Sequence, residues 1–197
     1  MVHKTNVSKN TSEVNMHCVL MLSELMVMTL PNAQSGGCEC QYHRISHSEG
    51  IKVIYSPRYI GGEKMILRYS TLKDLLASPH WTEAERQFAL MTELSAGERA
   101  PKPYEIMVVV DNNSGFFYPA IRMEHVEHQM IYSCGFNNDK QNRIHKGRNS
   151  WINCLGKRFS LTDTHEGNIV WIPTKKRFMI LDYGDVRDIR EDHSKGQ

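Results

Sequence analysis

The chain has 197 residues, which is enough for one domain or for two small lobes around a cleft. Its 24 lysine and arginine residues nearly balance its 22 aspartate and glutamate residues. A net charge of +2 creates no broad field for a polyanion, so charge gives no reason to expect nucleic-acid binding. The five cysteines lack a zinc-binding spacing and predict free thiols in a reducing compartment.

The N-terminal residues 1–18 are polar and predict a flexible leader. The apolar run at residues 19–30 that follows is interrupted by Ser23, Glu24 and Thr29 and is too short to cross a bilayer. It also lacks the small-residue cleavage site of a secretory signal peptide. We therefore expect no membrane association.

The next segments predict a small sheet. Residues 25–30, 38–45 and 50–55 have strand composition, and the glycine turn Gly36-Gly37 separates the first two. A further strand is predicted at residues 65–69 and a short capped helix at residues 70–77.

A longer helix is predicted to begin at Trp81 and Thr82. Thr82 is the expected N-cap, because Glu85 follows it at the spacing of a capping box. Gly97 is the expected stop signal, and the proline pair Pro101 and Pro103 prevents continuation.

The second half begins with a predicted hairpin formed by residues 106–110 and 116–121 around a polar turn. Residues 133–150 are polar and contain glycines, so we expect a loop or a loosely ordered insertion there. A helix is predicted at residues 150–159.

Three polar residues near the C-terminal end have a spacing typical of phosphoryl transfer. Asp163 precedes Asn168 by five positions, and Asp182 lies 19 residues beyond Asp163 in the sequence Asp-Tyr-Gly. Apolar runs at residues 169–172 and 178–181 predict a hairpin that places both acids at one end. Phosphoryl transfer requires a carboxylate for the attacking hydroxyl, with an amide and a second carboxylate for magnesium. Each residue taken singly is also a common turn residue.

This pattern resembles that of the protein kinase-like superfamily, in which H-R-D-x-x-x-x-N is followed by D-F-G. The resemblance covers about residues 25–186, and the Asp-x-His variant at Asp163 is similar to atypical branches of the superfamily. It implies an α+β, minimal bilobal kinase-like fold with an antiparallel-sheet N-lobe and a truncated helical C-lobe. The implied boundaries are a leader at 1–18 and a kinase-like domain at 19–197, with an N-lobe at 19–122, a hinge at 123–126 and a C-lobe at 127–197.

The resemblance also implies roles for the motif residues. Asp163 would orient the substrate hydroxyl and accept its proton, whereas Asn168 and Asp182 would hold Mg²⁺. His165 would support the loop rather than act as the base.

Further roles are implied upstream of the loop. Gly36 and Gly37 would cover the ATP phosphates, and Lys52 would bind them, with Lys64 as the alternative. Glu85 would pair with the lysine, with Glu83 and Glu93 as rivals. The backbone of Met123, Glu124 and His125 would bind adenine.

Little sequence follows Gly184, so the layout is similar to that of minimal bacterial effector kinases of the HopBF family. That resemblance implies an ATP- and Mg²⁺-dependent serine/threonine kinase that is delivered by type III secretion and acts in the host cytoplasm. It implies the chaperone HSP90 as the protein substrate and a monomeric enzyme. A bacterial cytoplasmic location remains the alternative.

Three other functions stay open. The first is a small-molecule phosphotransferase of the aminoglycoside type. The short segment after Asp182-Tyr-Gly argues against it, because that segment normally forms the acceptor pocket. The second is a catalytically dead pseudokinase that acts by binding, although Lys52, Asp163, Asn168 and Asp182 are all present. The third is a nucleic-acid module, which the near-neutral charge disfavours.

Overall fold

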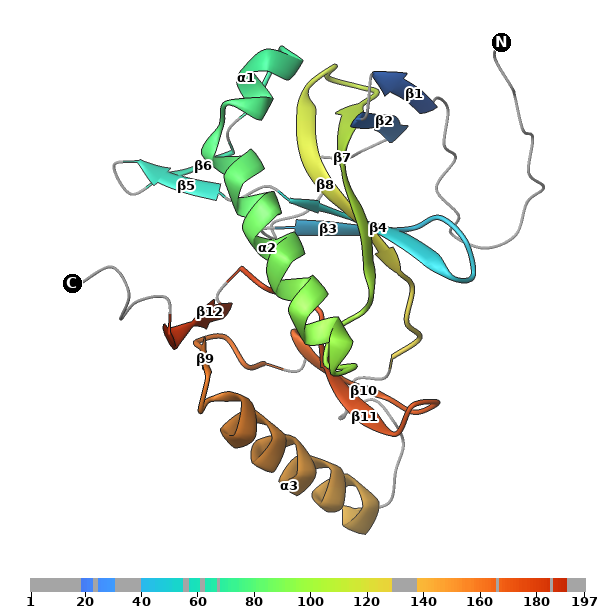
Figure 1. Cartoon of the computed structure of the whole chain (residues 1–197), viewed down its shortest axis with the longest axis vertical. Helices are drawn as coiled ribbons and strands as arrows, with labels where there is room; N and C mark the ends of the chain where they lie inside the picture. The colour runs from blue at the N-terminus through green and yellow to red at the C-terminus, as the bar shows by residue number, and fades with distance from the viewer. Residues whose placement is uncertain are drawn as a thin grey trace. The chain divides into compact units, whose positions relative to one another are not determined.

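A computed structural model describes residues 19–22, 25–30, 40–54, 57–60, 63–66, 68–128, 138–165, 167–184 and 186–190. The chain forms two compact units. Unit 1 comprises Met1–Ala89 with Lys102–His125, and unit 2 comprises Leu90–Pro101 with Val126–Gln197. Figure 1 labels the helices and strands of both units.

Unit 1 is built on a six-stranded sheet with the order β1-β2-β7-β8-β4-β3. Neighbouring strands run antiparallel except β2 and β7, which run parallel. The strands are β1 (Val19–Leu22), β2 (Leu25–Leu30), β3 (Cys40–Arg44), β4 (Glu49–Ile54), β7 (Pro103–Asp111) and β8 (Phe117–Glu124). A separate hairpin contains β5 (Pro57–Ile60) and β6 (Glu63–Ile66). The strands predicted at residues 25–30, 38–45 and 50–55 correspond to β2, β3 and β4, and the predicted hairpin corresponds to β7 and β8. The strand predicted at residues 65–69 was misplaced, since β6 is Glu63–Ile66.

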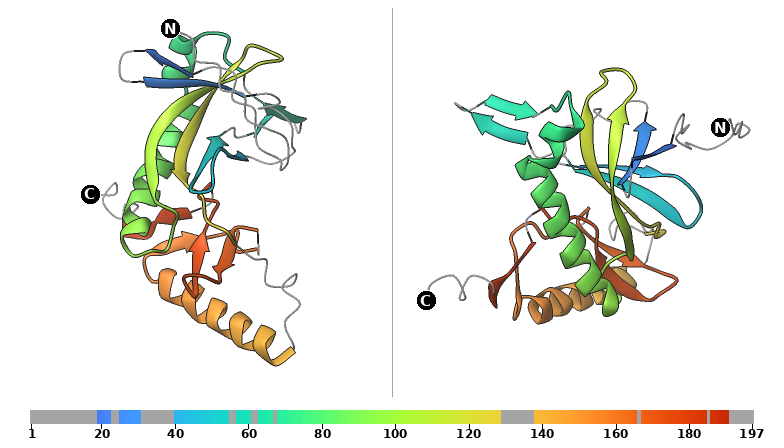
Figure 2. Two further views of the ribbon diagram at one scale, coloured as in Figure 1. Left: turned by 90° about the vertical axis from the view of Figure 1, so that its right-hand side faces the viewer. Right: turned by 45° about the horizontal axis from the view of Figure 1, so that its top comes forward.

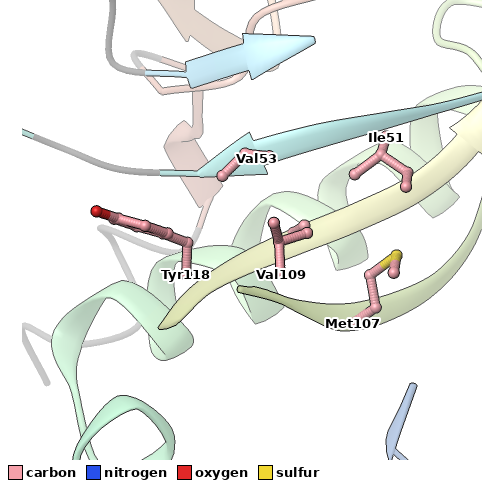
Figure 3. Packing of buried hydrophobic residues seen from close by; sticks show 6 residues of the cluster. Ile51, Val53, Met107, Val109 and Tyr118 are labelled. Atoms are coloured by element: carbon pink, nitrogen blue, oxygen red, sulfur yellow. The ribbon is translucent and has the colours of Figure 1, made fainter. Parts of the chain in front are cut away.

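The two faces of this sheet have different neighbours. Successive residues of a strand project to opposite faces, so Ile51 and Val53 of β4 lie on one face. There they form a buried cluster with residues of β7 and β8 (Figure 3), namely Met107, Val109, Tyr118 and Ala120. On the other face, Val108 packs with Leu75 of α1 and Trp81 of α2. The helices α1 and α2 therefore cover the second face.

The caps of the two helices follow from short polar side chains. In α1 (Leu72–Leu76), Thr71 is the N-cap and accepts a hydrogen bond from the Asp74 N–H at 3.1 Å. The longer helix α2 (Pro79–Ala96) begins earlier than predicted, so Thr82 is a helix-interior residue and not the N-cap. Ser78 serves instead: its hydroxyl accepts from the Trp81 N–H at 3.2 Å. Proline at the first helical position suits this start because a first-turn N–H needs no intrahelical partner.

Unit 1 also contains a buried histidine whose titration should affect stability. His43 of β3 is 7% exposed, and its Nε2 has no hydrogen-bond partner among the described residues. Burial lowers the pKa of His43 below its usual 6.5. The unfolded chain therefore binds the proton at a higher pH than the folded chain, and the folded state loses stability as the pH falls through about 6.5.

Replacing His43 with glutamine should flatten the decline in unfolding free energy between about pH 7 and pH 5, because the buried titrating group is removed. Urea unfolding at several pH values measures this slope. His47→Gln is the matched control, since His47 is exposed near the end of the same strand. Identical slopes for wild type and His43→Gln would contradict the expectation.

Unit 2 contains the helix α3 (Asn138–Leu155), the end of α2 and two short antiparallel ladders. The ladders pair β10 (Ile169–Ile172) with β11 (Arg177–Ile180), and β9 (Phe159–Leu161) with β12 (Val186–Asp188). The predicted hairpin at residues 169–181 is confirmed. The α+β class is likewise confirmed.

The helix α3 corrects two predictions, since residues 138–150 are helical rather than a loop and the helix ends at Leu155 rather than at residue 159. Ile144, Trp151 and Leu155 share one side of the helix because they are separated by seven and four positions. Gly147 faces the hairpin, since a Cβ there would be in ordinary van der Waals contact with the Phe178 ring at 3.6 Å. Figure 2 shows α3 beside the β10–β11 hairpin in both views.

A charged network connects the parts of unit 2. Arg158, just after α3, forms ion pairs with Glu93 of α2 and with Asp188 of β12, the latter at 2.8 Å. Arg190 also binds Asp188, at 2.7 Å. Because the Asp188 side chain is only 9% exposed, both cations compensate a largely desolvated carboxylate.

Candidate phosphotransfer site

Lys52 is a buried cation on the helix-covered face of unit 1. It is 2% exposed and pairs across the sheet with Ile121 of β8, which in turn pairs with Ile106 of β7. Directly opposed residues project to the same face, as do residues two positions apart. Lys52 therefore shares the face of Val108 and of the helices. The alternative lysine, Lys64, lies on β6 in the separate hairpin.

The three candidate glutamates have different surroundings. Glu85 is exposed and accepts a hydrogen bond from the Trp81 indole N–H at 3.0 Å. The Glu83 side chain is only 22% exposed and accepts from Arg86 Nε at 2.8 Å and from the buried Gln87 amide at 2.9 Å. Glu93 belongs to the Arg158 network of unit 2. Of the three carboxylates, that of Glu83 is the least exposed, and it is held by two neighbouring side chains of α2.

The predicted hinge has two backbone donors that are already engaged within unit 1. The Glu124 N–H donates to the Lys102 carbonyl at 2.8 Å, and the His125 N–H donates to the Ser48 carbonyl at 2.8 Å. Met123 is buried and pairs with Gly50 of β4. A base bound beside this hinge in its present conformation would need hydrogen-bond donors other than these two. Gly36 and Gly37, predicted to cover the phosphates, lie outside the described residues.

The loop that carries Asp163 is in unit 2 and is organised by His165. The Gly167 N–H donates to His165 Nδ1 at 2.9 Å, so a neutral imidazole carries its proton on Nε2. This Nε2 lies 3.5 Å from Asp163 Oδ2. The Asp163 side chain is 43% exposed and thus accessible to a substrate. His165 thus lies beside the carboxylate, and its supporting role stays a prediction.

Asn168 and Asp182 lie at one end of the β10–β11 hairpin. The ladder pairs Ile169 with Ile180, and beyond it the Leu181 N–H donates to the Asn168 carbonyl at 2.8 Å. The Asn168 side-chain amide donates to the Asp163 carbonyl at 3.4 Å. These two bonds bring the loop of Asp163 and the turn of Asp182 together within unit 2.

The turn after β11 is held by a buried tyrosine. Tyr183 is 0% exposed, and its hydroxyl donates to the Ile180 carbonyl. Burial, followed by the nearby Asp182 charge, raises the pKa of Tyr183 well above its usual value, so this donor stays protonated. Asp182 Oδ1 accepts from the Gly184 N–H at 3.2 Å. Both bonds fix the backbone that presents Asp182.

The donor chemistry of this end suits magnesium bound together with phosphates. Mg²⁺ prefers oxygen ligands and is commonly held by one or two carboxylates plus substrate phosphates. Asp182 supplies a carboxylate, and Asn168 supplies an amide oxygen. Across the described ranges, no three histidine, cysteine, aspartate or glutamate side chains gather as a metal-binding group.

The sequence predicted no role for the Tyr42 side chain, although this residue is the direct cross-strand partner of Lys52. Tyr42 lies two residues after the start of β3, and it becomes a neighbour of Lys52 only through the register between β3 and β4. A register between β3 and β4 depends on the connecting turn, so the sequence alone did not reveal the pair.

Within the described part of the chain, no helix is long and apolar enough to cross a membrane. No family model matches the sequence, and no curated protein matches it. Nothing in these comparisons links the chain to the HopBF family.

Some solved structures are similar to this chain. One is the co-crystal structure of WbdD with the kinase inhibitor LY294002, which has a TM-score of 0.45 and 14% sequence identity. The match covers 78% of this chain and 32% of the WbdD chain, so this chain spans about a third of that length.

Proposed function

We propose that this chain has a kinase-like fold and is an ATP- and Mg²⁺-dependent phosphotransferase that modifies serine or threonine hydroxyls of a protein. The observation that carries the proposal is the connection between the loop of Asp163 and the turn of Asp182 through Asn168. An accessible carboxylate, an amide and a second carboxylate thus lie at one end of a hairpin, and phosphoryl transfer uses these groups.

The proposed chemistry assigns one task to each group. Asp163 orients the substrate hydroxyl and accepts its proton as a new oxygen–phosphorus bond forms to the γ-phosphorus. The bond between that phosphorus and the bridging oxygen breaks, and ADP leaves with the bonding electron pair. Asn168 and Asp182 would hold Mg²⁺, which neutralises charge on the phosphates when bound. The resemblance to protein kinases assigns to Lys52, a buried residue of unit 1, the binding of ATP phosphates.

Glu83 is the glutamate that we propose as the partner of the lysine in place of Glu85. Its carboxylate is partly buried and is fixed by Arg86 and Gln87, whereas that of Glu85 is exposed beside Trp81. A fixed, partly desolvated carboxylate positions a cation better than an exposed one.

The choice of acceptor rests on the resemblance to the HopBF family. On that basis we propose the chaperone HSP90 as the substrate and a type III effector acting in the host cytoplasm as the biological context. A small-molecule phosphotransferase and a binding-only pseudokinase are outcomes that the experiment below distinguishes.

The test is label transfer from γ-³²P-ATP with Mg²⁺ to purified HSP90, other candidate proteins and an aminoglycoside. Asp163→Asn should reduce transfer by about 100- to 10,000-fold because the proton acceptor is lost. His165→Gln is the matched loop control and should retain at least about a tenth of the activity, since it only supports Asp163.

Each outcome has a distinct meaning. Equal transfer by wild type and Asp163→Asn would refute the proposed mechanism. Label on the aminoglycoside alone would support a small-molecule phosphotransferase, and nucleotide binding without any transfer would support a pseudokinase. Transfer to another protein but not to HSP90 would support protein kinase activity and exclude HSP90 as the substrate.

A further inference from the structure

The Tyr42 ring lies over Gly50 of β4, in the space that a side chain at that position would occupy. A Cβ atom at Gly50 would lie 2.0 Å from Tyr42 Oη and 2.3 Å from its Cζ. Such distances are far inside van der Waals contact, so the end of the Tyr42 ring fills the space that any other side chain would take. Gly50 is buried beneath it.

The ring is fixed in this place by His125. Tyr42 Oη and His125 Nδ1 form a hydrogen bond of 2.6 Å, and the two rings are stacked at an angle of 24° with centroids 5.8 Å apart. Burial raises the pKa of Tyr42 to about 12, with the Arg44 cation acting in the opposite direction. The hydroxyl thus stays protonated and can donate to the imidazole. The His125 backbone is itself held by Ser48.

Tyr42 nevertheless remains accessible. It is 43% exposed, one of three large hydrophobic residues with high exposure among those described. An aromatic ring that is fixed at its tip and exposed elsewhere needs little ordering before a flat ligand binds, so little conformational entropy opposes stacking.

The position of Tyr42 relative to Lys52 indicates the kind of ligand. The two residues are direct partners across β3 and β4, and directly opposed side chains share one face of a sheet. Gly50, under the ring, precedes Lys52 by two residues, or about 7 Å along a strand. A fixed aromatic surface and a buried cation therefore lie one strand repeat apart on the same face. A nucleoside triphosphate combines a flat aromatic base with an anionic chain and fits this pair.

We propose that Tyr42, seated on Gly50 and tied to His125, is the surface on which the nucleotide base stacks. This inference rests on the proposed function and adds to it the residue that recognises the base. Base stacking on an aromatic side chain tolerates any base, so Tyr42 would contribute affinity, and discrimination between bases would come from other groups.

The test compares the binding of Mg²⁺·ATP and of Mg²⁺·tripolyphosphate to the full chain by isothermal titration calorimetry. Tyr42→Ala and Tyr42→Leu should weaken ATP binding by about 5- to 100-fold because the stacking surface is lost. Tyr42→Phe should stay within about threefold of wild type because the ring is kept. Tripolyphosphate has no base, so all four proteins should bind it equally.

Tyr104→Ala is the matched control, since Tyr104 is another exposed tyrosine of unit 1 and is 38% exposed. Thermal unfolding of each variant confirms that it is folded. Tighter ATP binding by Tyr42→Ala would show that the ring covers the site and would overturn the proposal. An equal loss for ATP and tripolyphosphate, or no change for either, would also overturn it. Failure of wild type to bind ATP at all would overturn the proposed function as well.

Discussion

Lys52→Met should lower kcat/KM for ATP by at least about 100-fold, because removal of one preorganised cation from a phosphate site weakens binding of the transferring group. Methionine keeps an unbranched stem of similar length, so the packing of β4 against β8 should persist. Lys52 is 2% exposed, and this burial should make its cation more effective than a surface lysine. Steady-state label transfer at several ATP concentrations measures the effect.

Lys73→Met is the matched control for this substitution. Lys73 lies on α1 in the same unit but is exposed, so its loss should change kcat/KM by less than about twofold. Circular dichroism establishes that both variants are folded. If folded Lys52→Met were as active as wild type, Lys52 would not bind the nucleotide, and Lys64 would be the next candidate.

Asp182→Asn should raise the Mg²⁺ concentration needed for half-maximal transfer by about 10- to 100-fold, because the charged oxygen ligand is lost. Asparagine still offers an oxygen to the Gly184 N–H, so the turn after β11 should survive the substitution. The effect on metal dependence is therefore separable from an effect on folding. A magnesium titration of transfer activity, with thermal unfolding as a second measurement, tests both parts.

Asp139→Asn is the control, since Asp139 is an exposed carboxylate in the first turn of α3 in the same unit. It should leave the magnesium titration unchanged. A shift of equal size in Asp139→Asn and Asp182→Asn would indicate a general charge effect on metal association. No shift in either variant would exclude Asp182 as a ligand.

Local sequence was enough to predict the hairpin of unit 2 and the arrangement at its end. Two apolar runs around a polar turn define the pairing of β10 with β11, and Asn168 and Asp182 flank those runs. A hairpin brings its two ends together whatever surrounds it, so these residues became neighbours by connectivity. The cap of α1 at Thr71 also depends on neighbouring residues only, since its partner Asp74 is three positions along the chain.

Local sequence failed where the signal was polar or ambiguous. The helix α3 contains Gly147 and few apolar residues, so its polar composition suggested a loop, whereas Ile144 and Trp151 lie on one side of the helix. The start of α2 was misplaced because Thr82 matches a capping box, while the proline after Ser78 defines the observed start.

The sequence by itself therefore determined the chemical groups of the candidate site and those contacts that adjacent residues enforce. Only the tertiary structure decided which face of α2 Glu83 and Glu85 occupy, because the phase of a helix depends on the sheet that it covers. The same holds for Tyr42 and His125, which are 83 residues apart in the chain and meet above Gly50 only when β3, β4 and β8 pair in one register. Strand register is set by packing and turns across the whole sheet, so no local pattern contains it.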